Sequence, residues 1–172
     1  MTFIIMIFVL IGAGVAQSHA PEWAFFGQAK FPFLLAVVFY YALNREIHFL
    51  LISGFLAGLL QDSLSPIPLG ISAVCFCVLG LVAARLRRMV ITDSVLTYII
   101  FGGLGGTVAT VCLYLMLKTG NYIVGYPGWV ARKAIGTGIL GMFCAPLIYY
   151  IVGWLDRIVG NVYLGESIDG IE

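Results

Sequence analysis

The stretch GLLQDSLSPIPLG, residues 58–70, places Asp62 between two long apolar segments of the chain. A charged aspartate at the centre of a membrane helix costs about 2.5–3.5 kcal/mol, so it requires compensation nearby. Ser65 suits the N-cap of the following helix, with Pro66 and Pro68 in its first turn, where missing N–H groups cost nothing. The positive end of that helix dipole would lie beside the Asp62 carboxylate. The stretch therefore predicts a sharp hairpin between two membrane helices.

The composition on either side of this hairpin predicts a membrane protein. Hydrophobic residues make up 62% of the 172 residues and charged residues only 10%, whereas soluble domains average roughly 25% charged residues. A soluble fold of this size would lack the polar residues to cover its surface, but lipid accepts an apolar one. We expect an all-α membrane protein with a single six-helix transmembrane domain, residues 1–155, and a polar acidic tail in water, residues 156–172.

Six apolar segments are expected to cross the bilayer, which requires about 20 residues per helix. They are Thr2–Ala16 (or Thr2–Ala20 with the polar end included), Phe33–Leu43, His48–Leu60, Pro66–Ala84, Val95–Leu117 and Ala134–Leu155. The second is short, so we expect it to recruit Phe25 and Phe26 or to end in the headgroup region. The first resembles a signal peptide, but it lacks a basic start, and Pro21 follows the would-be cleavage site. We interpret it as an uncleaved helix.

Basic residues indicate which connections face the cytoplasm. The densest cluster is Arg85, Arg87 and Arg88, between the fourth and fifth segments, and Arg45 follows the second. The positive-inside rule then places these connections, and both termini, in the cytoplasm. Five Lys and Arg residues face inside and four outside, the latter being Lys30, Lys118, Arg132 and Lys133. The arginine cluster fixes topology and touches anionic lipid, or it also contacts a cytoplasmic partner.

Small residues gather in the third, fifth and sixth segments. Gly54 and Gly58 form a GxxxG pattern, as do Gly102 and Gly106, and Gly138 belongs to a similar surface on the sixth segment. Glycine at this spacing lets helix backbones approach closely. Two interpretations are open: packing within the bundle, or a docking groove for a partner's helix or for a second copy of the chain, which would make a homodimer.

The sequence shows no set of residues suited to catalysis or to metal binding. The cysteines lie in apolar segments, and Cys75 and Cys77 point to nearly opposite helix faces. Aspartyl catalysis in a membrane needs two acids, and the acids other than Asp62 are expected in loops or the tail. We therefore expect no enzyme, no cofactor and no metal ion. The nine Lys and Arg residues are too dispersed for nucleic-acid binding. Asp62 either only stabilises the hairpin or also contacts a partner protein or polar ligand.

The residues of the hairpin resemble a known family signature. Gly58-Leu-Leu-x-Asp62, followed by Pro68, Leu69 and Gly70, is similar to the signature of the MreD family of rod shape-determining membrane proteins. The chain length, the Lys-Phe-Pro32 entry to the second segment and the basic connection after the fourth support this resemblance. The longer acidic end, Asn161–Glu172, departs from the family pattern.

The resemblance implies a non-enzymatic subunit of the cell-elongation (Rod) complex, or elongasome, in the bacterial inner membrane. Family members associate with the single-pass protein MreC. Through it they connect to the actin-like MreB, the glycosyltransferase RodA and a class B penicillin-binding protein, which links the cytoskeleton to peptidoglycan synthesis. The resemblance also implies a fold like that of the six-helix substrate-binding subunits of energy-coupling-factor transporters.

Three functions compete at this point. The first is a scaffold subunit that acts through protein contacts in the membrane. The second is a substrate-binding membrane subunit of a small-molecule transporter, with a pocket formed by the connections at residues 17–30 and 118–129. The third, an intramembrane hydrolase or transferase, lacks paired acids and any Ser/His or Cys/His set in this sequence. The first is preferred.

Overall fold

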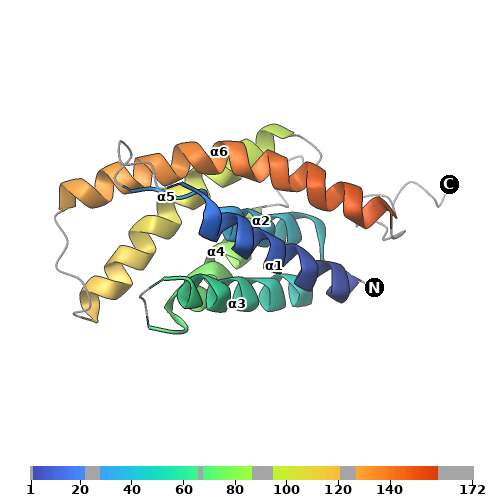
Figure 1. Ribbon diagram of the computed structural model, residues 1–172, viewed down its shortest axis with the longest axis horizontal. Helices are drawn as coiled ribbons and strands as arrows, with labels where there is room; N and C mark the ends of the chain where they lie inside the picture. The colour runs from blue at the N-terminus through green and yellow to red at the C-terminus, as the bar shows by residue number, and fades with distance from the viewer. Residues whose placement is uncertain (1, 22–27, 66–67, 87–94, 121–126, 159–172) are drawn as a thin grey trace.

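A computed structural model describes residues 2–21, 28–65, 68–86, 95–120 and 127–158 of the chain. Within these ranges all regular secondary structure is helical, as the sequence predicts. The helices are α1 (Thr2–His19), α2 (Phe33–Asn44), α3 (Ile47–Ser63), α4 (Ile71–Leu86), α5 (Val95–Thr119) and α6 (Pro127–Ile158). They alternate in direction, so the first turn of α1 and the last turn of α6 lie at the same end of the bundle (Figure 1).

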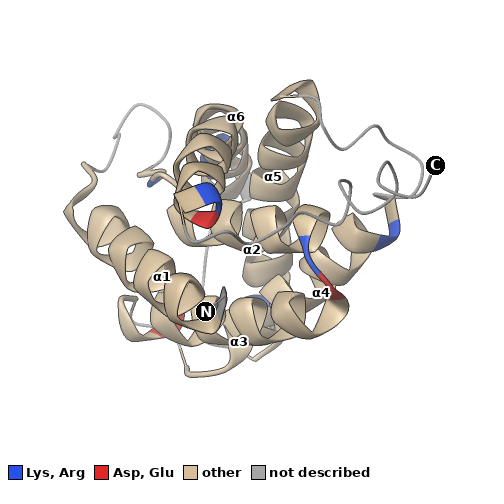
Figure 2. Cartoon of the chain, turned by 90° about the vertical axis from the view of Figure 1, so that its right-hand side faces the viewer, with Lys and Arg blue, Asp and Glu red and all other residues tan. Residues whose placement is uncertain are grey.

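α2 is the central helix of the bundle. Every residue from Leu34 to Leu43 is buried, and α2 packs against each of the other helices, which surround it in Figure 2. Its sequence, FLLAVVFYYALN, is apolar around nearly the whole circumference, as a helix without an exposed face requires. By contrast, α1 exposes large hydrophobic side chains, with Ile4 74% and Phe8 73% exposed. The bundle therefore has an apolar interior and an apolar exterior.

The helices differ in length. α5 and the Gly128–Ile158 part of α6 are long and apolar enough to cross a membrane, whereas the other described helices are shorter. α2 has 12 residues, about 18 Å, which is less than the hydrocarbon thickness of about 30 Å. Residues 25 and 26, which we expected α2 to recruit, lie outside the described ranges.

The contact between α3 and α4 depends on glycine. A Cβ atom added at Gly58 would lie 2.1 Å from the Cα of Ala73, so the two backbones touch at this point. A Cβ at Gly54, one turn earlier, would lie 3.2 Å from the Sγ of Cys77. Both glycines of the first GxxxG pattern thus pack within the chain.

The contact between α5 and α6 has the same basis. A Cβ at Gly102 would lie 2.3 Å from the carbonyl oxygen of Gly141, and one at Gly106 would lie 2.7 Å from that of Thr137. A Cβ at Gly138 would meet a side chain of α5 at 2.4 Å. Of the two interpretations of these glycines, the structure shows internal packing.

Two of the predicted segments, the fourth and the sixth, have boundaries that differ most from those in the structure. α4 begins at Ile71 instead of Pro66, because Pro68 lacks an N–H and Gly70 has a φ of +103°, which interrupts a right-handed helix. α6 begins at Pro127 instead of Ala134, with proline at the first position where it is tolerated, and continues past Leu155 to Ile158. The second difference brings Asp156 into a helix, with consequences for the site.

Candidate functional site

Two aspartates are buried in the part of the chain that the structure describes. Asp62 lies in the last turn of α3 and is 2% exposed, and Asp156 lies near the end of α6 and is 0% exposed. A buried carboxylate requires hydrogen-bond or charge partners. Because α3, with 17 residues, is about 25 Å long and runs from the Arg45 end of the bundle to the other, the two carboxylates lie at opposite ends. We call them the Asp62 site and the Asp156 site.

At the Asp62 site the carboxylate binds backbone N–H groups at the start of α4. The N–H of Gly70 donates to Oδ2 at 2.7 Å, and the N–H of Ser72 lies 3.2 Å from both carboxylate oxygens. These donors belong to the end of the helix dipole that favours a negative charge. Hydrogen bonds to charged groups are worth about 1.5–3 kcal/mol each. The predicted position of Asp62 beside the start of the fourth helix is confirmed.

Ser65 does not cap this helix, and that prediction is wrong. Ser65 lies in the turn that follows α3, where its N–H donates to the backbone oxygen of Asp62 at 3.2 Å and its Oγ accepts from Gln61 at 3.4 Å. Pro68 precedes α4 instead of lying in its first turn, and Leu69 beside it is 72% exposed. Residue 66 lies outside the described ranges. The capping group comes from the preceding helix instead of from the adjacent sequence.

Two glutamines beside Asp62 hold the start of α2 in a similar way. Oε1 of Gln17, in α1, accepts the N–H of Leu34 at 3.2 Å, and Nε2 of Gln17 donates to Oε1 of Gln61. The first N–H groups of a helix have no partner within that helix, so Gln17 does for α2 what Asp62 does for α4. Gln61 and Asp62 are consecutive residues of α3. Asp62 binds the start of α4 directly, and Gln61 contacts the start of α2 through Gln17, so both helices begin beside the end of α3. Gln17 was not among the predicted site residues; its signal in the sequence is an amide at the polar end of an apolar segment.

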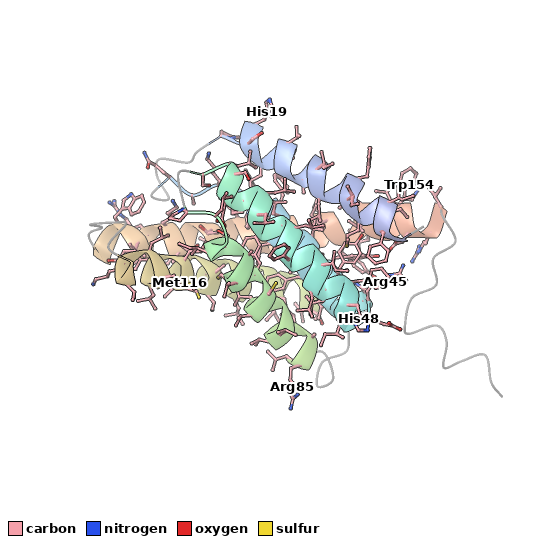
Figure 3. The ribbon with its side chains drawn as sticks, turned by 90° about the horizontal axis from the view of Figure 1, so that it is seen from below. His19, Arg45, His48, Arg85, Met116 and Trp154 are labelled. Atoms are coloured by element: carbon pink, nitrogen blue, oxygen red, sulfur yellow. The ribbon has the colours of Figure 1, made fainter. Side chains whose placement is uncertain are left out.

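At the Asp156 site an ion pair joins α2 to α6. Oδ2 of Asp156 accepts from Nη2 of Arg45 at 3.0 Å and from the hydroxyl of Tyr40 at 2.9 Å. Arg45 directly follows α2 and its side chain is 11% exposed. Figure 3 shows Arg45, His48 and Trp154 toward the same end of the molecule, and Met116 and His19 away from it. The Asp156 site thus lies at the end of the bundle where α1 begins.

Tyrosines and an amide pack around this ion pair. Nδ2 of Asn44 donates to the hydroxyl of Tyr98 at 2.6 Å, and the ring of Tyr98 lies 4.3 Å, centroid to centroid, from that of Tyr149. Tyr40 and Tyr149 are also ring neighbours, at 6.3 Å. Because Tyr98 is in α5 and Tyr149 in α6, the cluster links the central helix to both long helices.

The expected location of Asp156 is wrong. The sequence predicts a water-exposed tail from residue 156 onward, with no buried acid except Asp62, but Asp156 is fully buried. The reason is its contact with Arg45, 111 residues earlier, which compensates the carboxylate inside the bundle. The two buried acids lie at opposite ends of the bundle and hold different helices.

The other predicted site residues lie on the surface or outside the described ranges. Arg85 is exposed in the last turn of α4, and the expectation of a cytoplasmic contact at Arg87 and Arg88 falls on residues that are not described. The cysteines are free and are buried or half-buried. Among the described residues, no three His, Cys, Asp or Glu side chains come close enough together to hold a metal ion.

The charged residues of the described helices lie near helix ends, and the exterior between them is apolar. They are Asp62, Arg85, Lys118, Arg132, Lys133, Asp156 and Arg157. Such an arrangement, with one buried carboxylate ion-paired and the other hydrogen-bonded, is consistent with a helical membrane protein. The family model of MreD, described as rod shape-determining protein MreD, matches residues 1–155. The chain belongs to the MreD family, as residues 58–70 predict. A search of curated proteins and a search of solved structures each gave no match.

Proposed function

We propose that the chain is a non-enzymatic scaffold subunit of the cell-elongation complex in the bacterial inner membrane. In this role it binds an MreC-like single-pass protein and so links the cytoskeleton to peptidoglycan synthesis. The observation that carries the proposal is the match to a rod shape-determining family over residues 1–155. Contacts with MreB, RodA and a class B penicillin-binding protein would follow through the MreC-like partner.

The arrangement of buried polar groups supports a scaffold role. Asp62 and Gln17 each bind the first N–H groups of a neighbouring helix, and Asp156 binds Arg45 and Tyr40 across two helices. Each of these groups holds helices in fixed relative positions. A rigid bundle with an apolar exterior suits a protein that presents a constant surface to a partner helix in lipid.

All six helices cross the membrane in this proposal, with α2 enclosed by the others. Exposed hydrophobic side chains on α1, α3, α4, α5 and α6 support the assignment, since lipid is the solvent that accepts them. The start of α1 and the end of α6 share one end of the bundle (Figure 1). That end, which includes Arg45 and Arg85, faces the cytoplasm by the positive-inside rule, so both termini are cytoplasmic.

Co-purification tests the proposal directly. A tagged chain is expressed with an MreC-like protein from the same cell and extracted in mild detergent, and rod shape is scored in cells that lack their own MreD protein. We expect the partner to be retained and rod shape to be restored. Gly58→Leu, which forces α3 from α4, should lose both. Gly12→Ala, where a Cβ meets nothing within 4 Å, should retain both.

A folded, monodisperse chain that purifies alone and does not restore rod shape would contradict the scaffold role. In that case a thermal-shift screen against vitamins and similar small molecules discriminates further. A clear increase in melting temperature with one of them would favour the substrate-binding subunit instead.

A further inference from the structure

The exposed apolar surface of the bundle is shorter along α3 and α4 than along α6. α3 has 17 residues and α4 has 16, so even with their polar ends they extend about 26 Å and about 24 Å. At the Arg45 end of the bundle the apolar part is shorter still, since His48 at the start of α3 and Arg85 at the end of α4 are exposed. Both helices thus fall short of the average hydrocarbon thickness of about 30 Å.

α6 has a longer apolar segment. Residues 134–155 lie between Lys133 and Asp156 without an intervening charge and extend about 33 Å. Large hydrophobic side chains are exposed along this segment, including Ile135 at 59%, Phe143 at 71% and Trp154 at 64%. This side of the bundle matches a bilayer of ordinary thickness with a slight tilt. One molecule therefore has two different apolar heights.

The short face has the chemistry that a lipid surface requires. α4 packs against α5 and α5 against α6, so the exposed side chains of α4 continue around the bundle into those of α6. Val74, Val78 and Val82, at one- and two-turn spacing, are all at least half exposed on α4. The exposed Arg85 at the end of this face complements the phosphate groups of a lipid headgroup layer.

We propose that the α3–α4 face takes up phospholipids with shorter acyl chains than the α6 face does, and so thins the bilayer on one side of the protein. The inference rests on the proposed membrane arrangement, in which α3 and α4 cross the bilayer. A mismatch of several ångströms costs a fraction of a kcal/mol per ångström, which short chains relieve. The bilayer beside α3 and α4 is then thinner than the bilayer beside α6.

Tryptophan quenching by brominated lipid tests this proposal. Two variants carry one tryptophan each, Val78→Trp at the middle of α4 and Phe143→Trp at the middle of the apolar segment of α6, with the three natural tryptophans replaced by phenylalanine. Each full-length variant is reconstituted in vesicles of phosphatidylcholine with 14-, 18- or 22-carbon chains that contain brominated lipid of a competing length. We expect the Val78→Trp site to bind 14-carbon over 22-carbon lipid about twofold more strongly. The Phe143→Trp site should not prefer the shorter chain.

Equal chain-length preferences at the two positions overturn the proposal. If Val78→Trp does not fold, Val74→Trp, at a position 54% exposed on the same helix, replaces it. Quenching at Phe143→Trp without any quenching on α4 overturns both this proposal and the six-span arrangement. Failure to bind an MreC-like partner, with the difference in chain-length preference retained, overturns the scaffold function alone.

Discussion

Removal of the Asp156 carboxylate should destabilise the bundle more than any single neutral hydrogen-bond deletion. Asp156→Ala leaves Arg45, whose side chain is only 11% exposed, without this carboxylate. Loss of one member of a buried pair costs about 3–5 kcal/mol, because the remaining charge is desolvated and poorly compensated. Tyr40→Phe removes a second donor to the same Oδ2 atom, at 2.9 Å. Hydrogen bonds between membrane helices average about 0.6 kcal/mol and reach about 1.7 kcal/mol.

The free energy of unfolding is measured in mixed micelles by titration with a denaturing detergent, with far-UV circular dichroism as the readout. We expect Asp156→Ala to lose more free energy than Tyr40→Phe loses. The double variant Arg45→Met/Asp156→Leu replaces both charges by apolar groups, so it should recover most of the loss.

Two results would refute this reasoning. Equal losses for Asp156→Ala and Tyr40→Phe would show that Arg45 reaches water once its partner is removed. A double variant no more stable than Asp156→Ala would show that packing at position 156, and not charge compensation, holds α2 to α6.

Three further predictions concern the other end of the bundle and its orientation. Gly58→Ala should abolish monodisperse protein in size-exclusion chromatography, because its Cβ would lie 2.1 Å from a backbone atom of α4, whereas Gly12→Ala should not. Asp62→Asn keeps an acceptor but loses the charge at the start of α4, so it should cost about 1 kcal/mol of unfolding free energy in the same titration. Asp62→Leu leaves two N–H groups without their acceptor and should cost more, at about 1–3 kcal/mol for each buried donor; equal costs would contradict the capping role. Because the C-terminus is proposed to be cytoplasmic, green fluorescent protein fused after residue 172 should fluoresce, and alkaline phosphatase fused there should be inactive. The reverse result would mean that the orientation is opposite to the proposed one.

The Asp62 site could be predicted in part because its residues are close together in the sequence. Asp62 and the start of α4 are separated by a short connection, so a carboxylate near a helix N-terminus follows from adjacent residues. The identity of the cap could not be predicted in the same way. Ser65 and Pro66 fit a helix start by residue type, but Gly70 adopts a positive φ and the helix begins only after it. Local residue preferences therefore predicted a carboxylate beside the start of the fourth helix, but they placed the first residue of that helix too early.

The Asp156 site could not be predicted from local pattern. Arg45 and Asp156 are 111 residues apart, and each follows an apolar segment, where a charge is ordinarily expected in water. Only the packing of α6 alongside α2 brings them within 3.0 Å. Gln17 was missed for the same reason, since its partners come from α2 and α3.

The sequence by itself determined that the chain is a helical membrane protein, because no soluble fold could cover so much apolar surface with 10% charged residues. Residues 58–70 also predict the family, which the match over residues 1–155 confirms. Only the tertiary structure decided which apolar helix is inside. α1 and α2 are similarly apolar, yet α2 is buried along its length and α1 exposes Ile4 and Phe8. The reason is the solvent: lipid and a protein interior both accept hydrophobic side chains, so hydrophobic pattern does not separate core from surface.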